Sequence, residues 1–245
     1  IELEKSEMKN EKKIAEEIMQ KNKIVKSVLV KMSARKKEIR TREYKLVLGD
    51  KNTEVLHKEH GYLIKVDPQE VYFSPRESTE RQRISDQIQK NETIMLMFAG
   101  VGAFAIAIAK KRSVQKIFAV EINKKGVEYI KENARINKLS HLIVPIHADV
   151  KKIPQEFLGK CDRVIMPLPL GAIDFLDVAL KCLKKEKGIV NLYAVSEEKN
   201  LFKDVEVKIK DEFKKLNKKY KIIARQKVLP YAPRKYKVRI DIEVI

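Results

Sequence analysis

Ile94-Met95-Leu96-Met97-Phe98-Ala99-Gly100-Val101-Gly102 is the stretch that decides the fold. Apolar residues run into two glycines, and an alanine-rich segment over residues 103–109 follows directly. This order predicts a buried strand, a tight turn and a helix that packs closely on a sheet. Gly100 and Gly102 would let the backbone approach a ligand that a Cβ atom would block, and the first amides of the helix would point at its polar groups. Two glycines alone favour an ordinary strand-to-helix turn, so the rest of the chain has to decide.

Short apolar runs and helical segments alternate through the chain around this stretch. Strands are expected over residues 94–97, 116–120, 141–146, 163–166 and 189–193, and helices over residues 78–90, 101–111, 124–136, 172–183 and 197–216. Residues 222–229 and 235–244 are expected to form two antiparallel strands at the end. Alternation of this kind predicts an α/β fold, in which a mostly parallel, Rossmann-like sheet has helices on both faces.

The first 70 residues follow other patterns. Residues 1–22 are charged, with apolar residues at loosely helical spacing, and predict a helical connector. Residues 23–70 contain short apolar runs separated by likely turn residues such as Gly49-Asp50 and Gly61, which predict a small β-rich module. A module of this size needs neighbouring structure to be stable. We therefore expect three parts, of which the third, the Rossmann-like domain, covers residues 71–245.

The chain is strongly basic. Among its 245 residues, 53 Lys and Arg against 34 Asp and Glu give a net charge of +19. Such an excess attracts polyanions. A lysine-rich surface of a heat-adapted protein would be enriched in acids as well, so the imbalance favours a nucleic-acid partner. A membrane surface fits less well, because the basic residues are not gathered on an amphipathic helix with bulky anchors.

The sequence shows no pattern for a membrane span, a signal peptide or a metal site. No apolar run approaches the length of a span, and no signal-peptide pattern opens the chain. Cys161 and Cys182 lack metal-ligand spacing, and the four histidines form neither a metal pattern nor a catalytic-triad pattern. Two cysteines do not indicate a disulfide framework, so we expect a protein of the reducing cytoplasm. We also expect a monomer without a metal.

Informative residues follow three of the predicted strands. In sheets of this type, ligands bind beyond the carboxyl ends of the strands, near the point where the strand order reverses. Glu121 ends the second strand, where a carboxylate can accept hydrogen bonds from both ribose hydroxyls of a nucleotide. Asp149 follows the third strand, where a carboxylate could accept from an adenine amino group. Each acid alone is more often a helix cap or a solvated loop residue.

The glycine turn and both acids at strand ends together indicate a cofactor site. An NAD-type site would share the turn and the second-strand acid. The acid after the third strand and the antiparallel ending favour S-adenosyl-L-methionine (AdoMet) instead. The fourth strand ends in Pro167-Leu168-Pro169, where amino-methylating enzymes place an Asn- or Asp-containing, proline-rich loop against the target base. Each proline locks φ, so this turn would hold its backbone carbonyls in fixed directions.

Several stretches jointly resemble one family. They are Arg40-Thr41-Arg42-Glu43-Tyr44, Val71-Tyr72-Phe73-Ser74-Pro75-Arg76, Thr79-Glu80-Arg81, Phe98-Ala99-Gly100-Val101-Gly102, Asp162-Arg163-Val164-Ile165-Met166 and Tyr231-Ala232-Pro233-Arg234-Lys235-Tyr236. From about residue 23 to its end, the chain resembles the archaeal class of tRNA (guanine-37-N1)-methyltransferases, which have a class I AdoMet-dependent fold. The resemblance implies AdoMet as cofactor, the anticodon stem-loop of a tRNA as partner, and a tRNA-elbow-binding domain that precedes this chain.

Two positions depart from the family pattern. Family members usually carry Asp where Leu96 stands and Asn where Pro167 stands. The first departure would slightly weaken cofactor capture. The second leaves the methylated base open, because the Asn would help to hold the guanine. Related archaeal paralogues methylate 4-demethylwyosine, a later tricyclic intermediate of wyosine synthesis, at the same tRNA position, and some carry out both reactions.

The resemblance also implies roles for individual residues. Methylation of guanine N1 requires a base for its proton and a donor for the charge that grows on O6. Glu80 is the implied base and Arg40 the implied O6 partner, since arginine stays charged and presents planar donors. Without the resemblance, Glu80 would be an ordinary acid in the first turn of a helix, and Arg40 one cation among 53.

The remaining implied residues divide between cofactor and tRNA. Those for AdoMet are Arg81 (near its carboxylate), Phe98, Gly100, Gly102, Glu121, Ile122, Asp149, Val150, Pro167 and Pro169. Those for tRNA are Arg40, Tyr72 (as a stacking surface for a flipped base), Arg76, Pro167 and Arg234. Two other function classes stay open: a non-catalytic RNA-binding module, and a methyltransferase of proteins or small molecules. The second leaves the basic excess and the β-rich module without a purpose.

Overall fold

A seven-stranded sheet forms the centre of the protein. A computed structural model describes residues 1–4, 6–33, 43–184 and 188–245. The sheet has the strand order β10-β11-β9-β8-β5-β6-β7. Its strands are β5 (Thr93–Leu96), β6 (Lys116–Glu121), β7 (Ile143–His147), β8 (Arg163–Met166), β9 (Gly188–Glu197), β10 (Tyr220–Ala232) and β11 (Lys235–Val244). Strands β5 to β9 are parallel, whereas β11 runs antiparallel to both β9 and β10. The predicted Rossmann-like α/β class, with its antiparallel ending, is confirmed.

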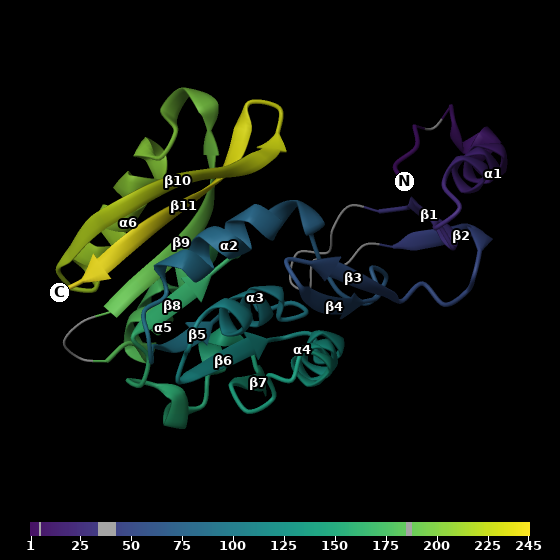
Figure 1. The fold of residues 1–245 in the computed structure, drawn as a ribbon. Helices are drawn as coiled ribbons and strands as arrows, with labels where there is room; N and C mark the ends of the chain where they lie inside the picture. The colour runs from purple at the N-terminus through teal and green to yellow at the C-terminus, as the bar shows by residue number, and fades with distance from the viewer. Residues whose placement is uncertain (5, 34–42, 185–187) are drawn as a thin grey trace.

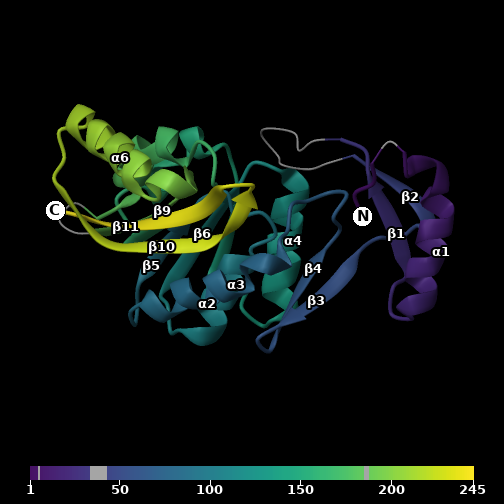
Figure 2. The same cartoon turned by 90° about the horizontal axis from the view of Figure 1, so that it is seen from above.

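Helices cover both faces of this sheet (Figures 1 and 2). One face carries α2 (Ser78–Gln87), α3 (Ala103–Lys111) and α4 (Lys124–Ile136), and the other carries α5 (Leu176–Cys182) and α6 (Lys203–Lys215). Successive side chains of a strand point to opposite faces. Accordingly Ile94 and Leu96 belong to the core under α2–α4, and Met95 and Met97 to the core under α5 and α6. This explains why the run over residues 94–97 is apolar throughout.

Several predicted boundaries differ from the observed ones, and long-range pairing and turn geometry explain two of these differences. Strand β9 continues to Glu197, four residues beyond its predicted end at residue 193, because β11 pairs with it along its whole length. The helix predicted from residue 197 therefore starts later, after the 3-10 turn η6 (Glu198–Asn200) and Phe202, whose φ of +73° places it outside helical geometry. The helix predicted over residues 172–183 begins as the 3-10 segment η5 (Ala172–Phe175). Further 3-10 turns are η1 (Met8–Asn10), η2 (Pro75–Glu77), η3 (Val150–Lys152) and η4 (Gln155–Phe157).

The N-terminal strands lie within the β-rich stretch predicted over residues 23–70, and they form two separate sheets. Helix α1 (Glu11–Lys21) packs on the antiparallel pair β1 (Ser27–Lys31) and β2 (Tyr44–Gly49). The second pair, β3 (Val55–Glu59) and β4 (Tyr62–Val66), packs on α3 and α4. In Figures 1 and 2, this second pair lies between the first one and the Rossmann-like domain.

Two asparagines of the α4 region fasten β4 to the domain. The Asn133 side chain accepts a hydrogen bond from the Lys65 amide (2.6 Å) and donates to the Lys65 carbonyl (3.0 Å). Asn137 forms the same two bonds with the backbone of Leu63 (3.0 and 2.7 Å). These amide side chains take the place of a neighbouring strand along β4, so its backbone groups are satisfied without one.

Within the described residues, none of the helices is long and apolar enough to cross a membrane.

Candidate active site

A pocket of about 390 Å³ opens where the parallel strands end. Residues from the ends of β5, β6, β7 and β8 line it on one side, and the segment that leads into α2 lines it on the other. The chain order of the sheet reverses at β5, which lies between β6 and β8. Crevices at such switch points are where α/β sheets bind ligands. The position therefore agrees with the cofactor site predicted from the strand ends.

The glycine turn after β5 uses its two glycines differently. Gly100 has a φ of +58° and lines the pocket, and its amide hydrogen bonds to Glu121. Gly102 has a φ of +79°, precedes α3 and is buried outside the pocket lining. A Cβ atom on Gly102 would lie 3.2 Å from the Ile130 side chain, so this glycine serves helix packing. Phe98 also has a positive φ (+56°), which presents its ring to the pocket and to Phe175, 5.1 Å away between ring centres.

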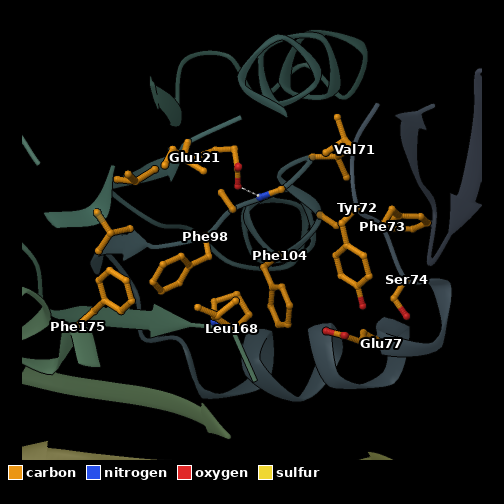
Figure 3. Close-up of a pocket in the computed structure, with 18 of the residues that line it drawn as sticks. Val71, Tyr72, Phe73, Ser74, Glu77, Phe98, Phe104, Glu121, Leu168 and Phe175 are labelled. Atoms are coloured by element: carbon orange, nitrogen blue, oxygen red, sulfur yellow. Dashed lines mark hydrogen bonds between the residues drawn. The ribbon is translucent and has the colours of Figure 1, made fainter. Parts of the chain in front are cut away.

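The carboxylate of Glu121 lines the pocket next to the glycine turn (Figure 3). Its Oε2 accepts from the amide of Gly100 (2.7 Å) and its Oε1 from the amide of Asn123 (2.8 Å). The residue is only 8% exposed. Burial raises the pKa of Glu121 above its ordinary value of 4.5, although the backbone hydrogen bonds oppose the rise. A carboxylate has about four acceptor positions, so this one can still accept from hydroxyl groups of a bound molecule.

Ile122, Asp149 and Val150 complete this end of the pocket. Asp149 also caps the 3-10 turn that follows it, because its Oδ1 accepts from the amide of Lys151 at 2.9 Å. Asp149 therefore both caps this turn and lines the pocket. Lys151 lines the pocket too, and its ammonium lies 5.4 Å from the centre of the Phe175 ring.

Tyr72, Arg81 and Pro167 line the other end of the pocket. The guanidinium of Arg81 is buried and donates to both carboxylate oxygens of Glu59 (2.7 and 2.6 Å) and to the carbonyl of Ser74 (3.2 Å). Arg81 thus ties the segment before α2 to strand β3. Leu96, which stands where the family usually has Asp, is fully buried in the core and does not line the pocket.

Besides Gly102, four of the predicted site residues lie outside the pocket lining. Glu80 is 1% exposed, bonds to Arg239 and to the hydroxyl of Tyr193 (2.8 Å), and is not among the residues that line the pocket. Arg76 is exposed and reaches the carbonyl of Pro230 on β10 at 3.5 Å. Arg234 is exposed in the turn between β10 and β11, and Pro169 is buried and does not line the pocket. Arg40 lies outside the described residues.

Comparison with known proteins identifies the family of this chain. Residues 55–223 match the family model of the TRM5/TYW2 methyltransferase domain. The chain belongs to this family. It is 36% identical over 233 residues to the tRNA (guanine(37)-N(1))-methyltransferase Trm5b of Pyrococcus abyssi, and the match covers 95% of this chain and 68% of that protein. It is 37% identical over 219 residues to Trm5b of Methanocaldococcus jannaschii, covering 89% of this chain and 60% of that protein. This family member thus spans about two thirds of the length of these two relatives.

A third relative matches along nearly its whole length. The tRNA (guanine(37)-N(1))/4-demethylwyosine(37)-methyltransferase Taw22 of Nanoarchaeum equitans is 30% identical over 288 residues, covering 95% of this chain and 93% of that protein. Among solved structures, that of Trm5b from P. abyssi superposes on 100% of this chain and 72% of its own with a TM-score of 0.87 at 36% identity. The structure of M. jannaschii TYW2 in complex with AdoMet does so with a TM-score of 0.75 at 30% identity, covering 89% and 93% of the two chains.

Several pocket residues of this TRM5/TYW2 family member have no clear signal in the sequence. They include Glu77, Phe104, Lys151, Leu170 and Phe175. Gly126 does not line the pocket but packs behind it, since a Cβ atom there would lie 2.7 Å from Cγ of Glu121 and 2.9 Å from the carbonyl oxygen of Gly100. The aromatic and aliphatic residues resemble core positions in the sequence. Gly126 lies inside a helical pattern, and an isolated glycine there is a signal for a close approach of this kind.

Proposed function

We propose that this chain transfers a methyl group from AdoMet to N1 of guanosine 37 in the anticodon loop of a tRNA. The observation that carries the proposal is the pocket at the sheet's switch point, with the buried carboxylate of Glu121 at the end of β6, in a member of the TRM5/TYW2 family. The names of the two Trm5b relatives give the position and atom that are methylated in their case. The chain spans only part of those proteins, so we propose guanosine 37 as its substrate by analogy with them.

The residues of the pocket fit AdoMet at its adenosine end. Glu121 would accept hydrogen bonds from the ribose hydroxyls. These bonds would stabilise its ionised form, which burial disfavours. Asp149 would accept from the adenine amino group, and Phe98, Ile122 and Val150 would supply the apolar surface. When bound, the cofactor supplies an electrophilic methyl group on its sulfonium. The chain's own contribution is then to hold the two reactants in line.

The end of the pocket that would hold the nucleobase needs a proton acceptor, because guanine N1 carries a proton at neutral pH. We assign this role to Glu80 and the stabilisation of O6 to Arg40. Oε1 of Glu80 is held by Tyr193 and Arg239. Its buried Oε2 lies 3.6 Å from Nη1 of Arg83 and has no hydrogen-bond partner among the described residues. A buried acceptor without a donor is costly, and a proton from the substrate would remove that cost. The role requires the carboxylate to turn towards the pocket when RNA is bound.

The tRNA would approach over the basic surface. A net charge of +19 gives the chain a strong attraction for phosphates. Tyr72 at the pocket would stack on the flipped base, and the exposed Arg76 and Arg234 would contact the backbone. We assign methyl transfer to residues 71–245, RNA contacts to residues 23–70 and a connecting role to residues 1–22, in a monomer that works in the cytoplasm.

A second substrate is favoured by one observation. Pro167 and Leu168 give the base end of the pocket an apolar wall, which suits a bulkier tricyclic base. The N. equitans relative is named for both guanosine 37 and 4-demethylwyosine 37. The second candidate function is therefore methylation of 4-demethylwyosine, in addition to guanosine or in its place.

The deciding experiment is mass analysis of nucleosides after reaction of the chain with AdoMet and defined tRNA transcripts. We expect 1-methylguanosine at position 37, and calorimetry should show saturable AdoMet binding. A methylated tricycle without 1-methylguanosine would support the second candidate. Absence of saturable AdoMet binding at micromolar to millimolar ligand would favour a non-catalytic RNA-binding module.

A further inference from the structure

The pocket has two charged ends of different chemistry. Glu121 and Asp149 lie at the ends of β6 and β7, whereas Glu77 and Arg81 come from η2 and α2. Figure 3 shows Glu77 across the pocket from Glu121, near the hydroxyl end of Tyr72. Glu77 and Arg81 are four residues apart, a spacing that places two side chains on the same face of a helical segment. A carboxylate and a guanidinium therefore lie side by side at the end of the pocket remote from the proposed adenosine site.

A buried lysine holds one oxygen of Glu77. Lys237, from β11, donates to Oε2 of Glu77 at 2.8 Å and to the carbonyl oxygen of Pro167 at 3.3 Å. The Lys237 side chain is 3% exposed and that of Glu77 is 9% exposed. Lys237 thus fixes Glu77 against the Pro167 loop and orients its carboxylate. Within the described residues, Oε1 of Glu77 accepts no hydrogen bond, so an acceptor is left at the pocket.

Arg81 keeps donors to spare. A guanidinium has five N–H groups, and Arg81 uses three of them in its bonds to Glu59 and Ser74. The ion pairs at this end balance: Glu77 pairs with Lys237, and Glu59 with Arg81. A phosphate or another anion without a positive charge would be repelled by the carboxylate of Glu77. A ligand group with a positive and a negative charge side by side would match both residues.

An α-amino acid tail is such a group, since its ammonium only donates and its carboxylate only accepts. We propose that Glu77, held by Lys237, binds the α-ammonium of the cofactor's methionine tail, next to the α-carboxylate at Arg81. The inference rests on the proposed function, because it concerns the same cofactor. It makes Glu77 a binding residue rather than one half of a structural ion pair.

The test compares two ligands that differ in this tail. S-adenosylhomocysteine carries it, whereas 5′-methylthioadenosine has the same adenosine and thioether without it. Calorimetry on the whole chain should show that Glu77→Gln weakens binding of S-adenosylhomocysteine about 10- to 100-fold, the range for a lost hydrogen bond to a charged group. Binding of 5′-methylthioadenosine should stay unchanged.

Glutamine is the informative replacement. The Lys237 ammonium has only donors, so it would take the amide oxygen, and the amide NH₂ would then face the ligand ammonium and repel it. Glu121→Ala should weaken the binding of both ligands. Glu156 is exposed and lies outside the pocket, so Glu156→Gln should weaken the binding of neither. Thermal melting checks that each variant is folded.

The outcomes separate this inference from the function it rests on. If Glu77→Gln affects both ligands equally, or neither, Glu77 does not bind the tail, while the AdoMet site stands. If the unchanged chain binds neither ligand, the cofactor site fails and the inference fails with it.

Discussion

The backbone amide of Gly100 donates a hydrogen bond of 2.7 Å to Oε2 of Glu121. This bond joins the turn after β5 to the end of β6, so the glycine turn and the Glu121 carboxylate form one unit. Its geometry depends on the positive φ of Gly100 (+58°), a conformation that costs glycine little. Several predictions about the pocket depend on this unit.

Replacing Glu121 by Ala should weaken AdoMet binding by roughly 1.5–3 kcal/mol, the cost of losing hydrogen bonds to a charged group. Calorimetry measures the change directly. The fold should survive, because the variant removes a buried charge whose pKa is raised by burial. Unchanged affinity in a folded variant would remove Glu121 from the site.

The affinity for AdoMet should also depend on pH. Burial raises the pKa of Glu121, so as the pH falls through that raised pKa the ligand-free carboxyl becomes protonated. Ribose hydroxyls donate to the ionised form, so binding should be strongest above the raised pKa and weaken below it. Calorimetry at a series of pH values checks this, with Glu121→Gln as the control. A slope of the same size in that variant would assign the dependence to another group.

Gly126→Ala tests the packing behind the carboxylate. The new Cβ would lie 2.7 Å from Cγ of Glu121 and 2.9 Å from the Gly100 carbonyl oxygen, so the side chain or the turn has to move. Alanine is otherwise the better helix residue, by about 1 kcal/mol. We expect AdoMet affinity to fall at least about 10-fold, since the charged hydrogen bonds would be displaced, without loss of helix α4. The exposed Lys131 on the same helix, changed to Ala, is the matched control, and equal affinities in the two variants would contradict the prediction.

The base assignment predicts a separation of rate from affinity. Glu80→Gln keeps the shape of the side chain and an acceptor for Tyr193 and Arg239, but it cannot take up a proton as a carboxylate does. Single-turnover methylation should fall by about 10²–10⁴-fold, with far less change in AdoMet affinity. Arg40→Ala should behave in the same way. Near-normal turnover of Glu80→Gln across neutral pH would show that Glu80 is not the base.

The sequence predicted those parts of the fold that depend on local patterns. Helix α4 and strand β8 begin and end at the predicted residues, because apolar spacing and flanking polar residues mark both ends of each. Strand β9 is longer than predicted, because the length of a strand depends on its partner, here β11. The partner lies far along the chain and leaves no local signal.

The site was predictable where a residue follows a strand. Glu121, Asp149 and Pro167 were found in this way, and each lines the pocket. Glu77 and Lys237 were not found, since they are 160 residues apart in the chain and resemble ordinary surface charges in the sequence. Only the fold shows that this acid and this lysine meet in a buried position.

Pro167 provides the last prediction, which concerns the range of substrates. Asparagine, the usual family residue at this position, can both donate to and accept from a guanine edge through its amide. Proline offers only a backbone carbonyl, and here that carbonyl already accepts from Lys237 at 3.3 Å. The native chain should therefore hold guanine mainly through other residues and leave room for a tricyclic base. Pro167→Asn should shift the ratio of the two activities towards guanosine. Single-turnover rates on tRNA with guanosine or 4-demethylwyosine at position 37 measure this ratio, and equal AdoMet affinity of the two proteins serves as the control. If the native chain uses only guanosine and the variant leaves the ratio unchanged, Pro167 does not determine the substrate range.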